Sequence, residues 1–222
     1  MIKVIVFDLD DTLFSEQDFV VSGFKVVGEW LEQKHGIVGF FHEAYEVFKK
    51  GKRGNIFNLA LENMGVCYRE DMIHEMLLIY RDHFPAISLH HDAAWIIQHY
   101  FGNKHLSLIT DGYITSQKKK VAALGLEEKL LPIIYSDEFG RKNWKPSELP
   151  YRKIMDFWGY QNHEYVYVGD NPTKDFVTAK RLRWLTVRVK RENGEYTKIQ
   201  VETEQDADHT IISLRQLTEI IV

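Results

Sequence analysis

The chain has 222 residues, of which 45% are hydrophobic and 27% are charged, and its net charge is −4. These values are typical of a globular protein and exclude the strongly basic composition of a nucleic-acid-binding chain. The one cysteine, Cys67, excludes an intrachain disulfide, and we expect it to be buried or half-buried. Because the sequence has no run of about 18 apolar residues and no signal-peptide pattern, we expect no membrane span and a cytoplasmic location.

Short apolar runs predict the strands. The first covers residues 2–7, is rich in β-branched residues and ends at a group of acids. Later runs of this kind lie at 106–110, 133–135, 165–168 and 185–189, with a weaker one at 210–212. Helical patterns accompany them at 93–101, 116–124, 151–158, 175–182 and 214–221. This alternation predicts a parallel sheet covered by helices on both faces.

Residues 15–89 interrupt the alternation. Their patterns are helical only, at 19–33, 40–49, 56–63 and 71–83, and glycines separate them. We therefore predict an α/β fold with a Rossmann-like parallel sheet core, formed by residues 1–14 and 90–222. The segment 15–89 is predicted to be an inserted α-helical bundle, placed as a cap between the first and second strands.

Two acids follow the first predicted strand directly, and their spacing indicates a cation site. Asp8 and Asp10 are two residues apart, so their side chains point to the same side of an extended segment. Like charges on one side repel each other unless a cation binds them. Mg²⁺ is the expected cofactor, because it takes oxygen ligands and keeps water molecules that a substrate phosphate can replace.

Polar residues also follow other predicted strands. Because ligands bind at the carboxyl ends of the strands in an open α/β sheet, we expect these residues to meet at one edge. They are Thr110, Asp111 and Gly112 after the second run, Asp170 and Asp175 after the run at 165–168, and Lys145 before the helix at 151–158.

The order of these residues resembles that of the haloacid-dehalogenase-like hydrolase superfamily. The segment at residues 8–12, DLDDT, is similar to the family's first motif, DxDxT, and Gly169-Asp170 with Asp175 is similar to the fourth, GDxxxxD. Thr110 matches the hydroxyl of the second motif, and Lys145 the lysine of the third. The resemblance covers residues 2–14 and roughly 90–190, and the insertion at 15–89 matches the family's helical cap.

The resemblance implies a role for each matching residue. Asp8 would be the nucleophile that forms an aspartyl-phosphate, and Asp10 would act as general acid and then as general base. Mg²⁺ would be held by Asp8, the backbone carbonyl of Asp10 and Asp170, with Asp175 in support. Thr110 would donate to a phosphate oxygen, while Lys145 would neutralise another and keep Asp8 ionised. The presence of an acid at Asp10 favours phosphoryl transfer from an ester over dehalogenation, because a leaving alcohol needs a proton whereas a halide does not.

Several residues keep alternative interpretations. Lys142 competes with Lys145, since the family commonly has a second proline two residues after the first, whereas Pro150 here lies four after Pro146. Asp175 could instead cap its helix, and Asp111 and Gly112 fit a supporting turn. Arg53 lies in a glycine-rich, basic loop that is either solvated or a lid for an anionic substrate. The lysine run at 118–120 is expected to be a solvated helix face.

These features predict a phosphoric monoester hydrolase: a Mg²⁺-dependent phosphatase for a small metabolite. Candidate substrates are a sugar phosphate, a phosphoglycolate-like acid or a nucleoside monophosphate. A phosphosugar mutase of the same fold and a non-catalytic protein that binds Mg²⁺ and phosphate are the alternatives. A phosphorelay receiver domain fits the motif order and the helical insertion poorly. We expect a small-molecule phosphate ester as partner, with neither nucleic acid nor membrane, and the oligomeric state stays open.

Overall fold

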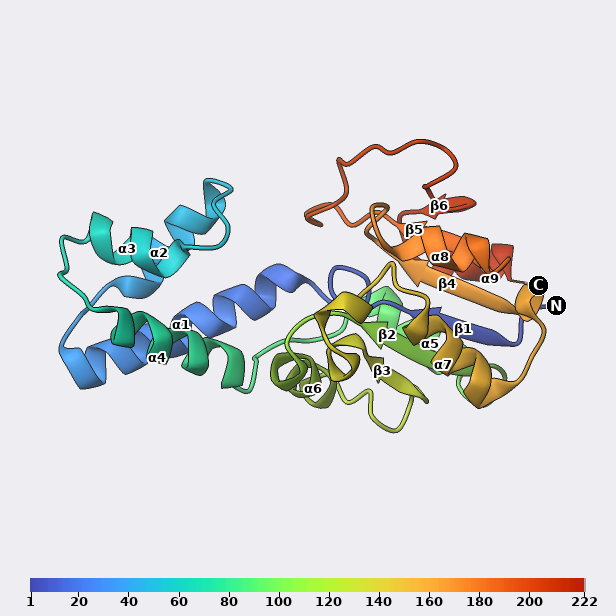
Figure 1. Cartoon of the computed structure of the whole chain (residues 1–222), viewed down its shortest axis with the longest axis horizontal. Helices are drawn as coiled ribbons and strands as arrows, with labels where there is room; N and C mark the ends of the chain where they lie inside the picture. The colour runs from blue at the N-terminus through green and yellow to red at the C-terminus, as the bar shows by residue number, and fades with distance from the viewer. Residues whose placement is uncertain (222) are drawn as a thin grey trace. The chain divides into compact units, whose positions relative to one another are not determined.

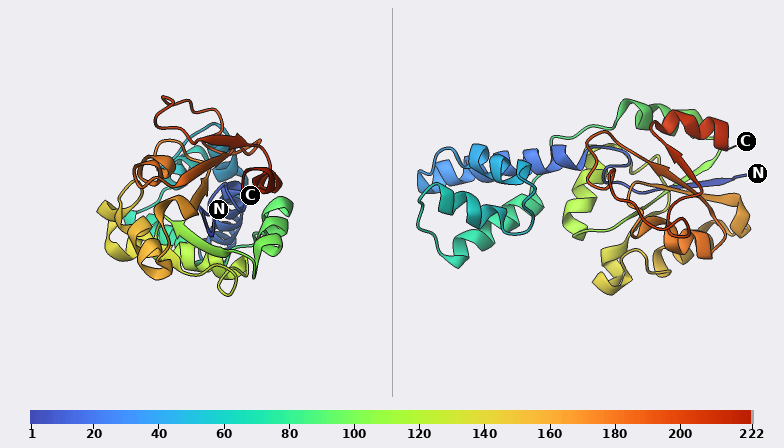
Figure 2. Two further views of the ribbon diagram at one scale, coloured as in Figure 1. Left: turned by 90° about the vertical axis from the view of Figure 1, so that its right-hand side faces the viewer. Right: turned by 90° about the horizontal axis from the view of Figure 1, so that it is seen from above.

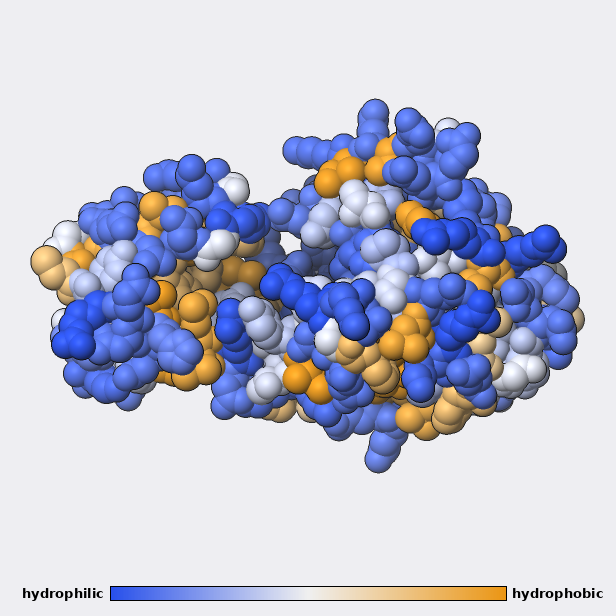
Figure 3. Space-filling view, viewed as in Figure 1, coloured by the Kyte–Doolittle hydropathy of each residue, from blue (hydrophilic) through white to orange (hydrophobic). Residues whose placement is uncertain are grey.

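The computed structural model describes residues 1–221, which form two compact units (Figure 1). The core unit joins Met1–Glu16 to the chain from Ser88 onward, and the helical unit is Gln17–Ile87. None of the helices in this range combines the length and the hydropathy that a bilayer span requires. Hydrophilic residues cover most of the face drawn in Figure 3, with apolar residues in small groups, as is usual for surfaces in contact with water.

The core unit contains a parallel sheet, which confirms the predicted α/β class. Within the described range the sheet has six strands in the order β3-β2-β1-β4-β5-β6. They are β1 (Val4–Phe7), β2 (His105–Thr110), β3 (Ile133–Tyr135), β4 (Tyr165–Gly169), β5 (Leu185–Val189) and β6 (His209–Ile211). β1 and β4 lie in the middle and are buried along their whole length, which explains their continuous apolar sequences.

Helices cover both faces of this sheet. Helices α7 (Leu149–Trp158) and α8 (Asp175–Arg181) contribute Tyr151, Ile154 and Phe176 to a core cluster with Val4 and Val6. Figure 2 shows α5 (His91–Tyr100) and α9 (Leu217–Ile220) on the other face. The predicted helix at 214–221 is wrong in its first turn, which is the 3-10 helix Leu214–Gln216, because Ser213 and Gln216 cap a tight turn there.

The helical unit has its own core. Its helices are α1 (Glu16–His35), which begins in the core unit, α2 (Phe40–Lys49), α3 (Ile56–Asn63) and α4 (Glu70–Asp82). Phe24, Phe57 and Tyr80 meet at its centre, with ring centroids 5.7–6.0 Å apart. The predicted helical bundle is therefore present. The prediction for Cys67 is wrong: this residue is exposed in the connection between α3 and α4.

The order of the strands determines where a ligand can bind. The chain proceeds from β1 outward to β2 and β3, and then returns to the opposite side of β1 with β4. In open α/β sheets, ligands bind at the carboxyl ends of the strands where the order reverses in this way. Here that position lies between β1 and β4, where the backbone N–H of Asp8 donates to the carbonyl of Val168 at 2.8 Å.

Candidate active site

A buried lysine joins the loops after β1 and β4. Lys145 lies before α7, and its ammonium donates a hydrogen bond to Oδ1 of Asp8 and lies 2.9 Å from Oδ1 of Asp175. The phenol oxygen of Tyr167 accepts a third contact at 3.0 Å. The competing Lys142 is exposed in the 3-10 helix Arg141–Asn143. Of the two candidate lysines, only Lys145 lies against the nucleophile candidate.

Three carboxylates share this position. One oxygen from each of Asp8, Asp170 and Asp175 lies within 4.8 Å of the others. Burial raises the pKa of Asp8 to about 7, although the Lys145 charge opposes the shift. Burial and the charges of Asp175 and Asp8 raise the pKa of Asp170 well above its ordinary value. In the described part of the chain, three carboxylates thus share the one ammonium that contacts them, that of Lys145, and their full ionisation is unfavourable unless a further cation binds.

The donor set of this cluster fits a divalent cation. Oδ2 of Asp170 is buried and has no hydrogen-bond partner among residues 1–221. A buried carboxylate oxygen without a donor is costly, and a hard cation would remove that cost. The Asp175 carboxylate is fixed by two contacts: its Oδ2 accepts the N–H of Asn171 at 3.0 Å, and its Oδ1 lies 2.9 Å from Lys145. The N-cap position of its helix is occupied by Lys174, so Asp175 faces the carboxylate cluster and is not the helix cap.

Asp10 points to a different group of side chains, on α6 (Ile114–Ala123). Its Oδ1 lies 2.6 Å from Nζ of Lys120, and its Oδ2 accepts from Nε2 of Gln117 at 2.7 Å. The same nitrogen lies 2.5 Å from Oγ1 of Thr110. The expectation that the whole lysine run is solvated is thus wrong for Lys120, which is 4% exposed, whereas Lys118 is exposed.

Asp111 and Gly112 support the second strand end. Asp111 accepts the backbone N–H of Lys145 at 3.1 Å, and its Oδ2 lies 3.0 Å from Nζ of Lys174. Burial alone would raise the pKa of Asp111, but Lys145 and Lys174 hold it below its ordinary value. Gly112 has φ +125°, and a Cβ there would lie 3.2 Å from the Gln117 side chain. Both residues thus fix the position of neighbouring site residues.

Sequence reasoning missed a further acid in the first motif. Asp11 has φ +51°, and its carboxylate accepts the backbone N–H groups of Glu16 and Glu195, each at 2.9 Å. This left-handed conformation is uncommon for residues other than glycine, and the two hydrogen bonds stabilise it. Burial and the Asp10 charge raise the pKa of the neighbouring Glu16 to about 7. The hydrogen bond from Glu195 to Asp11 connects the first motif to the loop after β5.

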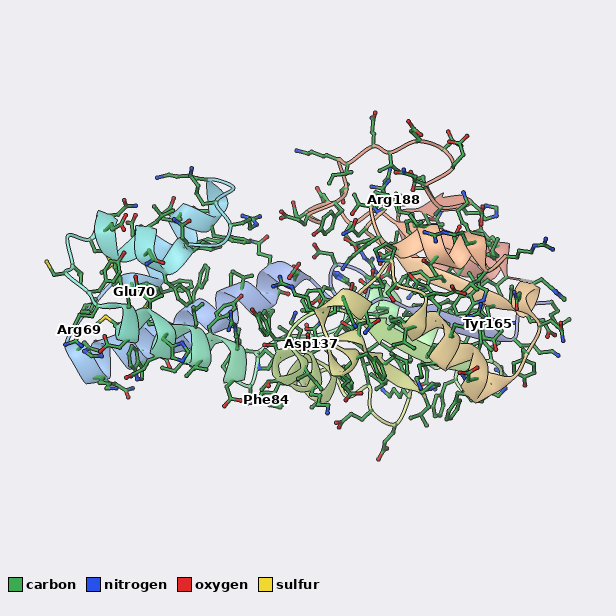
Figure 4. All side chains as sticks on the ribbon, viewed as in Figure 1. Arg69, Glu70, Phe84, Asp137, Tyr165 and Arg188 are labelled. Carbon is green, nitrogen blue, oxygen red and sulfur yellow. The ribbon has the colours of Figure 1, made fainter. Side chains whose placement is uncertain are left out.

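The loop after β5 is itself anchored by a buried arginine. Arg188 projects from β5 into this loop (Figure 4), where it donates to the carbonyls of Tyr196 at 2.8 Å and Ile199 at 2.9 Å. Its other terminal nitrogen lies 3.0 Å from Asp206. No periodic signal in the sequence distinguishes such an arginine from a surface residue.

Arg53 belongs to the helical unit and is exposed there. Its guanidinium donates to the carbonyls of Lys52 at 2.8 Å and Phe48 at 3.2 Å, and it lies over the Phe48 ring. These contacts shape its own loop. The expected role of Arg53 in substrate binding stays a prediction.

The sequence is similar to a known family and to named proteins along most of its length. A family model described as "Haloacid dehalogenase-like hydrolase" matches residues 5–189. The chain is 29% identical over 230 residues to a glyceraldehyde 3-phosphate phosphatase of Methanocaldococcus jannaschii, covering 100% of this chain and 97% of that protein. It is 27% identical to the protein of that name from Pyrococcus furiosus, and the match covers 99% of this chain and 93% of that protein.

Solved structures share the fold. A haloacid-dehalogenase-superfamily hydrolase of Geobacter sulfurreducens has a TM-score of 0.70 at 15% identity and covers 100% of this chain and 97% of its own. A 2-haloacid dehalogenase of Pseudomonas syringae has a TM-score of 0.68 at 20% identity, and the match covers 100% of this chain and 98% of that protein. At these identities the similarity supports the architecture and not the activity.

Proposed function

The chain belongs to the haloacid dehalogenase-like hydrolases, and we propose that it is a Mg²⁺-dependent phosphatase that works through an aspartyl-phosphate on Asp8. Its curated relatives are named phosphatases and match along the whole chain, so it is a phosphoric monoester hydrolase for a small phosphorylated compound. The observation that carries the mechanism is the contact of Lys145 with Asp8, beside the carboxylates of Asp170 and Asp175.

The first chemical step transfers the phosphoryl group to the protein. A carboxylate oxygen of Asp8 forms a bond to phosphorus while the bond from phosphorus to the substrate oxygen breaks, and Asp10 gives its proton to that oxygen. Thr110 and Lys145 would contact the phosphoryl oxygens, where charge is concentrated during the transfer. Lys145 also favours the ionised Asp8 that the attack requires.

The second step returns Asp8 to its starting state. Water forms a bond to phosphorus, the bond to Asp8 breaks, and Asp10 accepts the proton of the water. Asp10 is therefore protonated again when phosphate leaves. Because Lys145 contacts Asp175 as well as Asp8, it would stay beside the phosphoryl group as a cation in both steps.

Mg²⁺ would be held by Asp8, Asp170 and the backbone carbonyl of Asp10, with Asp175 in support. When bound, it would neutralise charge on the phosphoryl oxygens and help to align the group for displacement. The orphaned oxygen of Asp170 and the excess of carboxylates over ammonium groups support this assignment.

For the substrate we propose a three-carbon sugar phosphate of the glyceraldehyde 3-phosphate kind. The support is that three relatives of this name match with 25–29% identity. A relative named pyrophosphatase PpaX, at 24% identity, makes pyrophosphate the first competitor to test. We further propose that residues 15–89 act as a cap that limits the size of the substrate, and that Arg53 contacts its anionic part.

The test is phosphate release from a panel of esters with and without Mg²⁺. The panel contains glyceraldehyde 3-phosphate, phosphoglycolate, a nucleoside monophosphate, a hexose phosphate and pyrophosphate. We expect Mg²⁺-dependent release that is greatest for the triose phosphate and is lost in Asp8→Asn. Release that persists in Asp8→Asn would refute the proposed nucleophile, and release from no ester would refute the phosphatase.

A further inference from the structure

Helix α6 presents two buried polar side chains to the site. Gln117 and Lys120 are three residues apart, so they lie on the same face of the helix, and they are 1% and 4% exposed. Burying an ammonium is costly unless a partner compensates it. The partner here is Asp10, whose two carboxylate oxygens each receive one of these donors, at 2.6 and 2.7 Å.

We propose that Gln117 and Lys120 are positioning residues that hold Asp10 in place for both of its proton transfers, a proposal that rests on the proposed function. A carboxylate with a different donor at each oxygen has one favoured orientation, since rotation would exchange the donors. Asp10 itself is only partly buried, with its side chain 21% exposed, so packing alone does not fix it.

Gln117 also sets the direction of the Thr110 hydroxyl. Its side-chain nitrogen lies near three acceptors: Oδ2 of Asp10, Oγ1 of Thr110 and, at 2.7 Å, the carbonyl of Asp111. A carboxylate and a carbonyl cannot donate, which places the amide nitrogen and not its oxygen at this point. The amide nitrogen shares its two hydrogens among these three acceptors and cannot itself accept a hydrogen bond, so the hydroxyl hydrogen of Thr110 points away from it and remains available to a phosphoryl oxygen.

The two steps should depend on Lys120 to different extents. In the second step water loses a proton to Asp10, and the Lys120 ammonium holds the carboxylate that accepts it in place. In the first step a leaving group that is stable as an anion, such as 4-nitrophenolate, needs no proton from Asp10. With such a substrate, loss of Lys120 should slow the second step and spare the first.

The experiment is pre-steady-state release of nitrophenolate from 4-nitrophenyl phosphate by Lys120→Met. We expect a burst of about one nitrophenolate per enzyme, followed by a steady-state rate about 10- to 100-fold below wild type. An alkyl phosphate should show a slower first step and no burst. Gln117→Met should show the same burst and slow steady-state rate as Lys120→Met, and its KM should also rise because the Thr110 hydroxyl is reoriented. Lys118→Met changes the exposed neighbour and is the matched control.

Several outcomes would overturn the inference. Wild-type turnover in Lys120→Met would show that the contact has no catalytic use. An equal loss for both leaving groups, without a burst, would indicate a merely structural contact. If Lys120→Met does not fold, Gln117→Met gives the same readout. Failure of the proposed function is distinct, because wild type would then release no nitrophenolate with Mg²⁺, or Asp8→Asn would remain active.

Discussion

The ammonium of Lys145 lies 2.9 Å from a carboxylate oxygen of Asp175, and neither side chain is exposed to solvent. The same ammonium contacts Asp8, so one cation serves two buried acids. The acids beside it raise the pKa of Lys145 well above its ordinary value, even though burial opposes the shift. Lys145 therefore stays charged, and the integrity of the carboxylate cluster depends on it.

Replacing Lys145 should affect both stability and turnover. Lys145→Met removes the ammonium that contacts Asp8 and Asp175, so we expect the free energy of unfolding to fall by about 3–5 kcal/mol in the absence of metal. Turnover should fall by at least about 10²-fold. Thermal unfolding should show that added Mg²⁺ stabilises the variant more than wild type. Lys142→Met, at an exposed position, should match wild type in both assays. The reverse pattern would assign the active-site lysine to Lys142.

Mg²⁺ binding should release protons in a pH-dependent way. Burial raises the pKa of Asp8 to about 7, so below this pH a bound cation must displace a proton from the cluster. We expect the apparent affinity to fall by about tenfold per pH unit below pH ~7 for the proton on Asp8, and more steeply where Asp170, whose pKa is also raised, must lose a proton too. Calorimetric titration in two buffers with different ionisation enthalpies measures the proton release directly. An affinity that is constant from about pH 5 to 8 would contradict the assignment of these carboxylates as ligands.

Two glycines of α1 provide a matched test of packing in the helical unit. A Cβ on Gly23 would lie 2.4 Å from the ring of Tyr80, whereas a Cβ on Gly28 would be 3.4 Å from its nearest neighbour, the backbone nitrogen of Phe41. Gly23→Ala should therefore destabilise this unit by about 1–3 kcal/mol. Gly28→Ala should stabilise it by up to about 1 kcal/mol, because alanine favours helix. Thermal unfolding of both variants tests the contrast, and equal effects would refute the Tyr80 contact.

The strands and the strand-end residues could be predicted because each depends on local sequence. A short apolar run that ends in acids is recognisable without its neighbours, and the edge where Asp8, Thr110 and Asp170 lie follows from parallel topology. The roles of Gln117 and Lys120 could not be predicted. A helix turns by about 100° per residue, so a run of three lysines does not reveal which one faces inward.

Long-range contacts escaped prediction for a related reason. Asp11 accepts a hydrogen bond from Glu195, which is 184 residues away in the chain, and Arg191 donates to the carbonyl of Thr12 at 2.6 Å. Neither loop residue lies in a periodic segment, and no pattern links the two ends of the sequence. The positive φ of Asp11 also depends on these partners, because an isolated aspartate does not prefer that conformation.

The ion pair of Arg191 with Asp92 should make stability depend on pH. Oδ2 of Asp92 lies 2.7 Å from Arg191 and accepts the N–H of Leu214, also at 2.7 Å. Burial alone would raise the pKa of Asp92, but Arg191 and Leu214 hold it below its ordinary value. A lowered folded-state pKa means that the stabilisation is present above the unfolded pKa of about 3.9 and is lost as pH falls through the folded value.

We therefore expect Asp92→Asn to lower the free energy of unfolding by about 1–3 kcal/mol at neutral pH. The difference from wild type should shrink as the pH falls below about 4, because protonated Asp92 then resembles asparagine. Thermal unfolding across this range measures it, with Asp156→Asn, an exposed aspartate of α7, as the control. A deficit that stays constant down to acid pH would mean that the substitution removes packing or backbone hydrogen bonding, and not the charge interaction with Arg191.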